Sequence, residues 1–169
     1  MSLRVAILVI SDRSSKGERE DLAGPALAAR AEALGWIVTR QEIIPDDIPT
    51  IMDRLVRCAD DDAADVILTT GGTGFGARDV TPEATLGAIQ REAPGIAEAI
   101  RAASLVVSPH GMLSRARAGI RGRALIVNLP GSPKGALESL GVIEPALPHA
   151  VQLLRGTPDA EAGHSKAAV

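Results

Sequence analysis

Three apolar runs limit what this chain can fold into. Residues 5–10, 66–68 and 124–127 are rich in Val, Ile and Leu, and polar or glycine-containing segments follow each run. A strand that is apolar on both faces is typical of the centre of a parallel sheet, where helices cover both sides. The runs therefore predict an α/β fold built around buried parallel strands.

Helical patterns alternate with these strands. A further strand is expected from Trp36 to about Ile44. Apolar residues recur at helical spacing between the strands, and helices are predicted over residues 25–34, 46–56, 82–91, 95–105, 133–140 and 145–154. This order predicts a single-domain, doubly wound, mostly parallel sheet with helices on both faces. We expect the domain to span residues 1–156, and the small and polar residues 157–169 to form a flexible tail.

The composition excludes several classes of function. The 169 residues include 18 basic and 21 acidic side chains, so the chain lacks the basic excess that nucleic-acid binding requires. Trp36 and Phe75 are the only aromatic residues, so the core must be built from aliphatic side chains. The single cysteine, Cys58, rules out an intrachain disulfide or a cysteine zinc cluster, and we expect it to be a small buried residue.

The sequence shows neither a secretory signal pattern nor an apolar run of membrane-spanning length. This favours a soluble cytoplasmic protein that does not bind membranes. His110, His149 and His164 lie far apart without a metal-binding spacing, and the Gly-x-Ser-x-Gly pattern of a serine nucleophile is absent. We assign no chemistry to these histidines.

Polar residues follow the predicted strands at the edge where such sheets bind ligands. In an open α/β sheet, ligands gather at the carboxyl ends of the parallel strands. Four loops leave the strands there, after Ile10, Ile44, Thr69 and Val127. Their polar residues suit phosphate or a metal ion, and are Ser11 and Asp12; Asp46 and Asp47; Thr73, Arg78 and Asp79; and Asn128, Ser132 and Lys134.

The loop at residues 69–83 carries the strongest signal. It reads Thr-Thr-Gly-Gly-Thr-Gly-Phe-Gly-Ala-Arg-Asp-Val-Thr-Pro-Glu and connects a buried strand to a helix. Glycines at a strand end expose backbone amides that can hold phosphate. A carboxylate such as Asp79 would repel the phosphate unless a cation lies between them. The loop therefore predicts a phosphate site with a metal ion.

Two common nucleotide motifs fit this loop poorly. A dinucleotide fingerprint follows the first strand, and its helix begins within the glycines. Here the glycines follow the third strand, and residues 78–80 separate them from the helix. The P-loop pattern fails because no Gly-Lys-Ser/Thr follows the glycines.

Several of these residues also have a purely structural interpretation. Thr81, Pro82 and Glu83 form an ordinary helix start, with Thr81 as the expected cap. Asp79 alone could be bound within its own loop. Asp46 could cap the following helix, but Asp47 is a competing cap and would leave Asp46 free. Lys134 could be a solvated side chain or a ligand for an anion at a helix start.

Five motifs together resemble one known family. They are Ile10-Ser-Asp12, Ile44-Pro-Asp46, the glycine loop with its Arg-Asp-Val-Thr-Pro-Glu-Ala ending at 84, Met112-Leu-Ser-Arg115, and Asn128-Leu-Pro-Gly-Ser-Pro-Lys134. In order and spacing they resemble the molybdenum-cofactor biosynthesis proteins of the Mog type, the molybdopterin adenylyltransferases. The resemblance covers residues 4 to about 156, and it is closer to this branch than to the related MoaB branch.

The resemblance implies an activity and an assembly. It implies a homotrimer with the molybdopterin-binding domain fold that transfers AMP from Mg-ATP to the phosphate of molybdopterin and releases pyrophosphate. A molybdenum insertase would be a downstream partner. The alternative is a MoaB-type protein that binds molybdopterin, or acts as a scaffold, without catalysing the transfer.

The resemblance also assigns roles to individual residues. It implies that Asp46 and Asp79 are catalytic and hold Mg²⁺, and that Gly71 and Gly72 form the backbone cradle. Substrate-binding positions carried over in this way are Ser11, Thr73, Ser104 and Asn128. Further substrate-binding candidates, in the loop after the last predicted strand, are Pro130, Gly131 and Lys134. Because the nucleophile would already be a phosphate, no serine or cysteine nucleophile is required.

Overall fold

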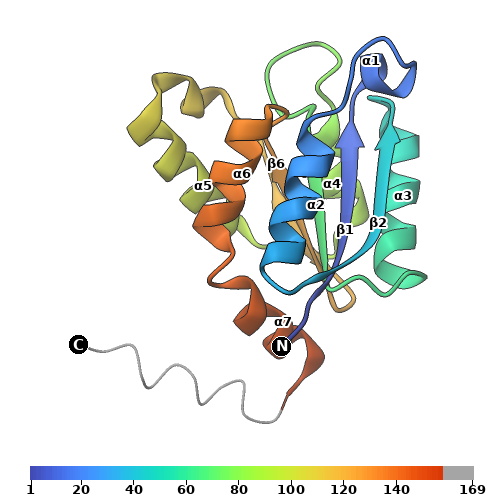
Figure 1. Cartoon of the computed structure of the whole chain (residues 1–169), viewed down its shortest axis with the longest axis vertical. Coiled ribbons are helices and arrows are strands. Elements are labelled where there is room, and N and C mark those ends of the chain that lie inside the picture. The colour runs from blue at the N-terminus through green and yellow to red at the C-terminus, as the bar shows by residue number, and fades with distance from the viewer. Residues whose placement is uncertain (158–169) are drawn as a thin grey trace.

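A computed structural model describes residues 1–157 of the protein. A mixed six-stranded sheet forms its centre (Figure 1). The strand order is β2-β1-β3-β6-β5-β4. Four neighbouring strands are parallel, namely β2 (Ile37–Ile44), β1 (Arg4–Ile10), β3 (Val66–Thr70) and β6 (Ala124–Leu129). Strand β5 (Ala118–Arg121) runs antiparallel to β6, and the short β4 (Arg91–Glu92) pairs with β5. The predicted mostly parallel α/β fold is confirmed.

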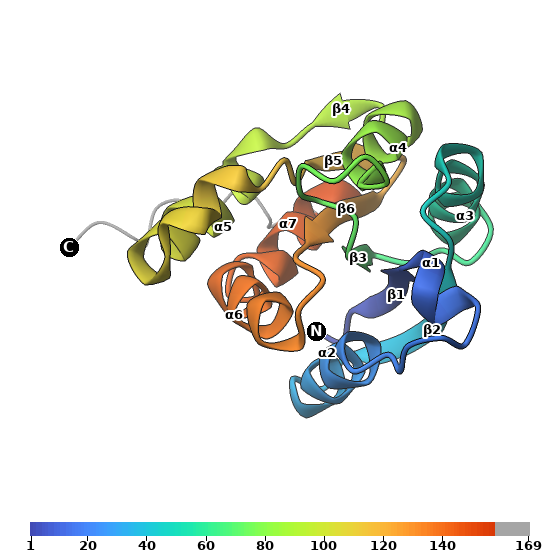
Figure 2. The same ribbon diagram turned by 90° about the horizontal axis from the view of Figure 1, so that it is seen from above.

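Helices cover both faces of this sheet (Figure 2). On one face lie α3 (Ile48–Asp60) and α4 (Thr81–Ala88), and on the other lie α2 (Ala23–Ala33), α5 (Pro94–Val107), α6 (Pro133–Ile143) and α7 (Leu147–Arg155). Each face of the sheet has its own hydrophobic core, and successive residues of β1 point to alternate faces. Val5 and Ile7 pack toward α2 and α6, and Ala6 and Leu8 pack toward α3. This double burial explains why the run is apolar throughout.

The core is aliphatic, as the composition predicts. Its fully buried large side chains are all Leu or Ile, and Trp36 contributes at the margin with 7% exposure. Phe75 is 70% exposed on the glycine loop. The only phenylalanine of the chain is therefore left outside the core, beside the candidate ligand site.

Four short elements and one helix end differ from the sequence-based expectation. Residues 11–21, for which no helix was predicted, contain a single helical turn, α1 (Asp12–Ser15), and a 3₁₀ turn, η1 (Pro109–Leu113), follows α5. Strands β4 and β5 were not predicted, and the helix expected to reach residue 91 ends at Ala88. Both strands are too short for a periodic pattern. Gly119 in β5 also has no side chain because Ile89 occupies that space, 2.4 Å from where a Cβ would lie.

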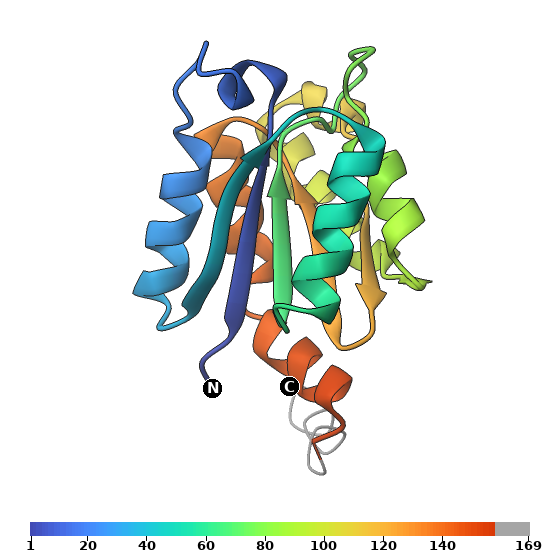
Figure 3. The same cartoon turned by 90° about the vertical axis from the view of Figure 1, so that its right-hand side faces the viewer.

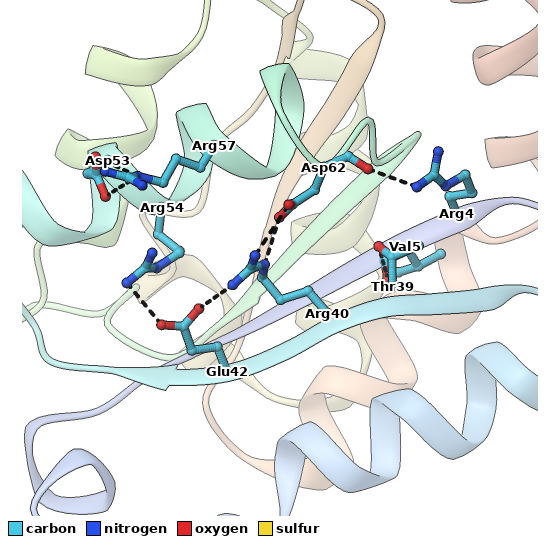
Figure 4. A network of polar contacts seen from close by, with 9 residues as sticks. All are labelled: Arg4, Val5, Thr39, Arg40, Glu42, Asp53, Arg54, Arg57 and Asp62. Carbon is cyan, nitrogen blue, oxygen red and sulfur yellow. Dashed lines mark hydrogen bonds and ion pairs between the residues drawn. The ribbon is translucent and has the colours of Figure 1, made fainter.

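Ion pairs connect β2, the strand at the outer edge of the sheet, to α3 and to the turn that follows α3 (Figure 4). Arg40 on β2 pairs with Asp62 at 2.7 Å and with Glu42 at 3.2 Å. Arg54 of α3 reaches the same Glu42 at 3.0 Å. Charged side chains along an edge strand discourage pairing with another chain, so this edge is protected and joined to α3.

Within residues 1–157, no helix is both long and apolar enough to span a membrane. The tail predicted for residues 157–169 falls, apart from Thr157, outside the described residues.

The burial of Cys58 predicts an inert thiol. Cys58 lies in α3 with no exposed surface, and burial raises the pKa of its thiol to about 12. Because the thiolate is the reactive form, we expect the native protein to react with a thiol reagent far more slowly than the protein unfolded in urea. Spectrophotometric titration of the thiol in both states measures this. Rapid reaction of the native thiol would contradict the packing of α3 against the sheet.

Candidate functional site

The carboxyl ends of β1, β2, β3 and β6 meet at one edge of the sheet (Figure 3). The loops at this edge line two adjoining cavities. The first, of about 360 Å³, is called the carboxylate cavity and is lined by Ser11, Asp46, Gly71, Gly72, Asp79 and Gly131, among others. The second, of about 490 Å³, is called the apolar cavity and is lined by Thr73, Phe75, Ile100, Ser104, Val107 and Pro130, among others. Ser132 contributes to both.

Glycines form the wall between β3 and β6 because no other residue fits there. Gly71 has φ +105°, and a Cβ on it would lie 2.3 Å from the carbonyl oxygen of Ile10. Gly72 has φ +64°, and a Cβ there would lie 2.9 Å from Asp46 Oδ1. Within residues 1–157 the amides of Gly72 and Thr73 donate to no protein acceptor. The strand end thus presents donors to the site, as a phosphate cradle requires.

Two hydrogen bonds attach the loop after β6 to this glycine wall. The Gly71 amide donates to the Leu129 carbonyl at 3.2 Å, and Thr70 Oγ1 donates to the Pro130 carbonyl at 2.6 Å. Helix α6 begins immediately afterwards, and Ser132 caps it as predicted by accepting from the Gly135 amide at 3.1 Å. The start of α6 therefore faces the same cavity as the glycine amides.

The predicted role of Thr81 as a helix cap is wrong. Thr81 is already the first residue of α4, and the cap position, Val80, makes no side-chain cap. Thr81 Oγ1 instead donates to the Gly71 carbonyl at 2.9 Å, and its amide donates to the Gly72 carbonyl at 3.1 Å. Thr81 therefore holds the glycine wall in its left-handed conformation.

Asp46 is free for another role because its neighbour caps the helix. Asp47 accepts from the Thr50 amide at 3.0 Å and caps α3. Asp46 is only 8% exposed and faces the loop after β1. Its Oδ2 accepts from the Asp12 amide at 2.7 Å, and its own amide donates to Asp12 Oδ1 at 3.1 Å. These reciprocal bonds lock the ends of β1 and β2 together.

Arg78 extends this lock to the glycine loop. Its guanidinium donates to both carboxylate oxygens of Asp12, at 2.9 and 3.1 Å. The bidentate geometry is the strong form of an arginine–carboxylate pair. Three segments from different strand ends, represented by Asp12, Asp46 and Arg78, are thereby joined around the carboxylate cavity.

The charges around this lock move two carboxyl pKa values in opposite directions. The hydrogen bond from Arg78 lowers the pKa of Asp12. Burial raises the pKa of Asp46, and the negative charges of Asp12 and Asp79 raise it further. Ionised Asp46 is therefore held in an unfavourable environment, which a bound cation would relieve.

Asp79 reaches the same cavity from the glycine loop. Its Oδ2 accepts from the Gly76 amide at 2.8 Å. A Cβ on Gly74 or on Gly76 would lie 2.9 Å from that oxygen, so both positions need glycine to make room for the carboxylate. The local bond that the sequence suggested for Asp79 does form, and it leaves Oδ1 available.

The two aspartates fit a magnesium ion that is shared with a phosphate ligand. Within residues 1–157, the Oδ1 atoms of Asp46 and Asp79 accept no hydrogen bond. No group of three or more His, Cys, Asp or Glu residues in that range could hold a metal. Mg²⁺ is usually held by one or two carboxylates, with phosphate oxygens and water completing its shell. This pair suits such an ion better than a metal held by the protein alone.

The remaining predicted positions divide between the two cavities and two places outside them. Ser11 lines the carboxylate cavity and caps α1 by accepting from the Ser14 amide at 3.1 Å. Thr73, Pro130 and Ser104 line the apolar cavity, and Ser104 Oγ donates to the Ile100 carbonyl at 2.8 Å. The cavities therefore bring together most of the predicted set.

Asn128 and Lys134 lie elsewhere. Asn128 is fully buried: its Nδ2 donates to Thr69 Oγ1 at 2.9 Å and to Thr85 Oγ1 at 2.8 Å, and its Oδ1 accepts from the Arg117 amide at 3.1 Å. It aligns the strand ends beneath the cavities and lines neither. The Lys134 side chain is 80% exposed, lines neither cavity and lies 3.8 Å from Glu138. This geometry matches the solvated interpretation of Lys134.

Sequence reasoning missed several residues that shape the site. The segment Arg19–Ala23 lines the carboxylate cavity, although no site residue was predicted in it. Asp12 and Arg78 were predicted only as groups suited to phosphate or metal, and Arg115 only as part of a motif. Their structural roles were missed because their partners are distant in the sequence.

Comparison with known proteins identifies the family. A family model described as the probable molybdopterin binding domain matches residues 6–149. The chain belongs to this family. The resemblance found in the five motifs is thereby confirmed.

Relatives match over nearly the whole chain. A molybdopterin adenylyltransferase of Helicobacter pylori strain J99 is 41% identical over 157 residues, covering 92% of this chain and 89% of the relative. A molybdopterin adenylyltransferase of Escherichia coli K12 is 37% identical over 175 residues, covering 92% and 87% respectively.

Solved structures share the fold at the same level of similarity. The molybdopterin biosynthesis enzyme MoaB from Thermus thermophilus has a TM-score of 0.86 at 47% identity, covering 92% of this chain and 98% of that one. The molybdopterin biosynthesis Mog protein from Mycobacterium ulcerans has a TM-score of 0.84 at 35% identity, covering 90% and 99%. Members of both named branches therefore share this architecture.

The raised pKa of Asp46 predicts a pH-dependent gain in stability for Asp46→Asn. Because the folded state holds this proton more tightly than the unfolded chain, the wild type loses stability as the pH rises through the raised pKa. Asparagine can still accept from the Asp12 amide but does not ionise. We expect the variant to be more stable than the wild type at pH 7, and the advantage to vanish below the ordinary carboxyl range.

Urea unfolding between pH 3.5 and 8 measures this difference. Asp53→Asn is the matched control, because Asp53 is exposed and pairs only with Arg57 at 2.9 Å. A variant at position 46 that is less stable than wild type at pH 7 would show that the cavity stabilises the Asp46 charge.

Proposed function

We propose that this protein is a molybdopterin adenylyltransferase, which transfers AMP from Mg-ATP to the terminal phosphate of molybdopterin and releases pyrophosphate. The observation that carries the proposal is the junction of the two cavities: two aspartates from different strand ends face a glycine-lined cavity that adjoins a larger apolar one. Relatives that are 37–41% identical over most of the chain bear the same name. The site and the relatives point to one reaction.

The carboxylate cavity suits the triphosphate. The amides of Gly72 and Thr73 and the start of α6 provide donors for phosphate oxygens. Asp46 and Asp79 would hold Mg²⁺, which would neutralise phosphate charge when bound. The side chains of this cavity then need only align the two phosphate groups, because the attacking group is itself a phosphate.

The apolar cavity suits the pterin. Ile100, Val107 and Phe75 offer a largely aliphatic surface for a ring system, and Thr73 and Ser104 offer polar groups. The position of Thr73 directly after Gly72 would place the pterin phosphate beside the nucleotide. Asn128 would support this arrangement from below through its bonds to Thr69 and Thr85.

We further propose that the protein works as a cytoplasmic homotrimer that passes its product to a molybdenum insertase. Support for an assembly comes from a group of exposed apolar side chains at the end of α5 and in η1: Leu105, Val106, Val107, Met112 and Leu113. Val106 is 88% exposed, which is costly for a monomer. The supply of Mg-ATP to the reaction supports a cytoplasmic location.

Light scattering of the purified protein tests the assembly. We expect a mass of three chains over the micromolar range of concentration, because the exposed apolar group would be covered by neighbouring copies. A mass of one chain at all concentrations would refute the trimer and leave the reaction to be judged separately.

A direct assay tests the reaction. The protein is incubated with molybdopterin and Mg-ATP, and pyrophosphate release is followed with a coupled enzyme. We expect release that depends on protein, molybdopterin and Mg²⁺ together. Tight molybdopterin binding without pyrophosphate would favour the alternative, a MoaB-type binding or scaffold protein, and would end the enzyme proposal.

The variant Asp79→Asn tests the carboxylate pair within this assay. We expect a loss of at least about 100-fold in kcat, because the metal would lose one of its two protein ligands. The loop should keep its shape, because the asparagine oxygen can still accept the hydrogen bond from the Gly76 amide. Circular dichroism and the unfolding midpoint should match the wild type, and Asp53→Asn again serves as the control. Turnover equal to wild type would remove Asp79 from the mechanism.

A further inference from the structure

Arg115 joins the two ends of the loop that carries Asp79. It follows η1 and directs its side chain into the glycine loop. Its Nε donates to the Gly74 carbonyl at 2.7 Å, its Nη2 donates to the Asp79 carbonyl at 2.5 Å, and its Nη1 pairs with Glu83. Its backbone amide donates to the Thr73 carbonyl at 2.9 Å. One residue thus binds four positions of a single loop.

The loop has little else to hold it. Between Gly74 and Asp79 the internal bonds are those between Gly76 and Asp79, where each amide donates to the other residue, at 2.8 and 2.9 Å. Residues 75–78 are exposed. Among the described residues, the only side-chain hydrogen bonds from this stretch to the rest of the protein are those that Arg78 donates to Asp12. The position of Asp79 relative to Asp46 therefore depends on Arg115 from one side and on Arg78 from the other.

The chemistry of these contacts requires a guanidinium. A planar fork can donate to two carbonyls and a carboxylate at once, whereas an ammonium is a point charge on a flexible stem. The hydrogen bond from Arg115 lowers the pKa of Glu83, so this partner remains ionised. Arg→Lys at this position is therefore not a conservative change.

Arg115 lines neither cavity but binds residues that line each of them. Thr73 and Gly74, which it binds at one end, line the apolar cavity. Asp79, which it binds at the other end, lines the carboxylate cavity. The neighbouring Ser114 itself lines the apolar cavity. Displacement of Arg115 would thus disturb both substrate sites through one loop.

We propose that Arg115 is a positioning residue, which fixes the Asp79 carboxylate opposite Asp46 and couples the apolar cavity to the carboxylate cavity. It does not reach the reacting atoms. It shapes the loop on which one metal-binding carboxylate is carried, so its effect belongs to the chemical step. The kinetic test of this inference rests on the proposed adenylyl transfer. The structural test rests on the loop geometry alone and needs no activity.

The kinetic test compares Arg115→Gln and Arg115→Lys with Arg117→Gln. Arg117 is the matched control, because it lies two residues away and its half-exposed side chain pairs with Glu92 at 3.4 Å. We expect both Arg115 variants to lose about 100-fold in kcat, because misplacing a reacting group by about 1 Å slows a reaction by about that factor. The KM for Mg-ATP should change less than threefold. Glu83→Gln should lose less than tenfold, because both carbonyl contacts remain. Arg117→Gln should equal wild type.

The structural test follows hydrogen exchange of the amides of Gly76 and Asp79, which are protected only by their bonds to each other. We expect exchange in Arg115→Gln to be at least tenfold faster than in Arg117→Gln, at an equal unfolding midpoint. Wild-type kcat in Arg115→Lys, or exchange equal to the control, would overturn the proposal. If the wild type itself releases no pyrophosphate, the proposed function fails, and the exchange measurement still decides whether Arg115 fixes the loop.

Discussion

The site depends on keeping a charged carboxylate, Asp46, nearly buried at the junction of two strand ends. Burial of an ionised group is unfavourable unless hydrogen bonds compensate for lost water. Asp46 receives one such bond from the Asp12 amide, and Asp12 is itself neutralised by Arg78. The charge of Asp79 nearby increases the cost. The fold therefore holds negative charges close together, an arrangement that a bound cation would stabilise.

This arrangement requires rigid connections among segments that are distant in the sequence. Thr81 holds Gly71 and Gly72, Thr70 holds Pro130, and the guanidinium of Arg115 holds the loop of Asp79. Nearly all of these contacts are side chain to backbone, which fixes the path of the loops rather than the side chains alone. Stability and function meet here, because the same bonds that close the loops also bring the two carboxylates to one cavity.

Much of the fold was predictable because burial on both faces leaves a clear pattern. The apolar runs at 5–10 and 124–127 correspond to β1 and β6, and Asp47 and Ser132 cap helices as their positions predict. Short elements were not predictable: β4 and β5 carry too few residues for periodicity, and Gly119 in β5 leaves room for the Ile89 side chain, which no local pattern reveals. Thr81 was misjudged because its partner, the Gly71 carbonyl, becomes accessible only when the glycine turn has formed.

The sequence by itself determined the class of fold and the family, because these follow from local pattern and motif order. It also singled out Asp46 and Asp79, whose roles stay a prediction. Only the tertiary structure decided which motif residues face a cavity. It placed Asn128 beneath the site and Lys134 on the surface, and it gave Asp12, Arg78 and Arg115 their partners. The physical reason is that hydrogen bonds and charge coupling depend on distances between strand ends, and parallel strands bring together loops that the sequence keeps dozens of residues apart.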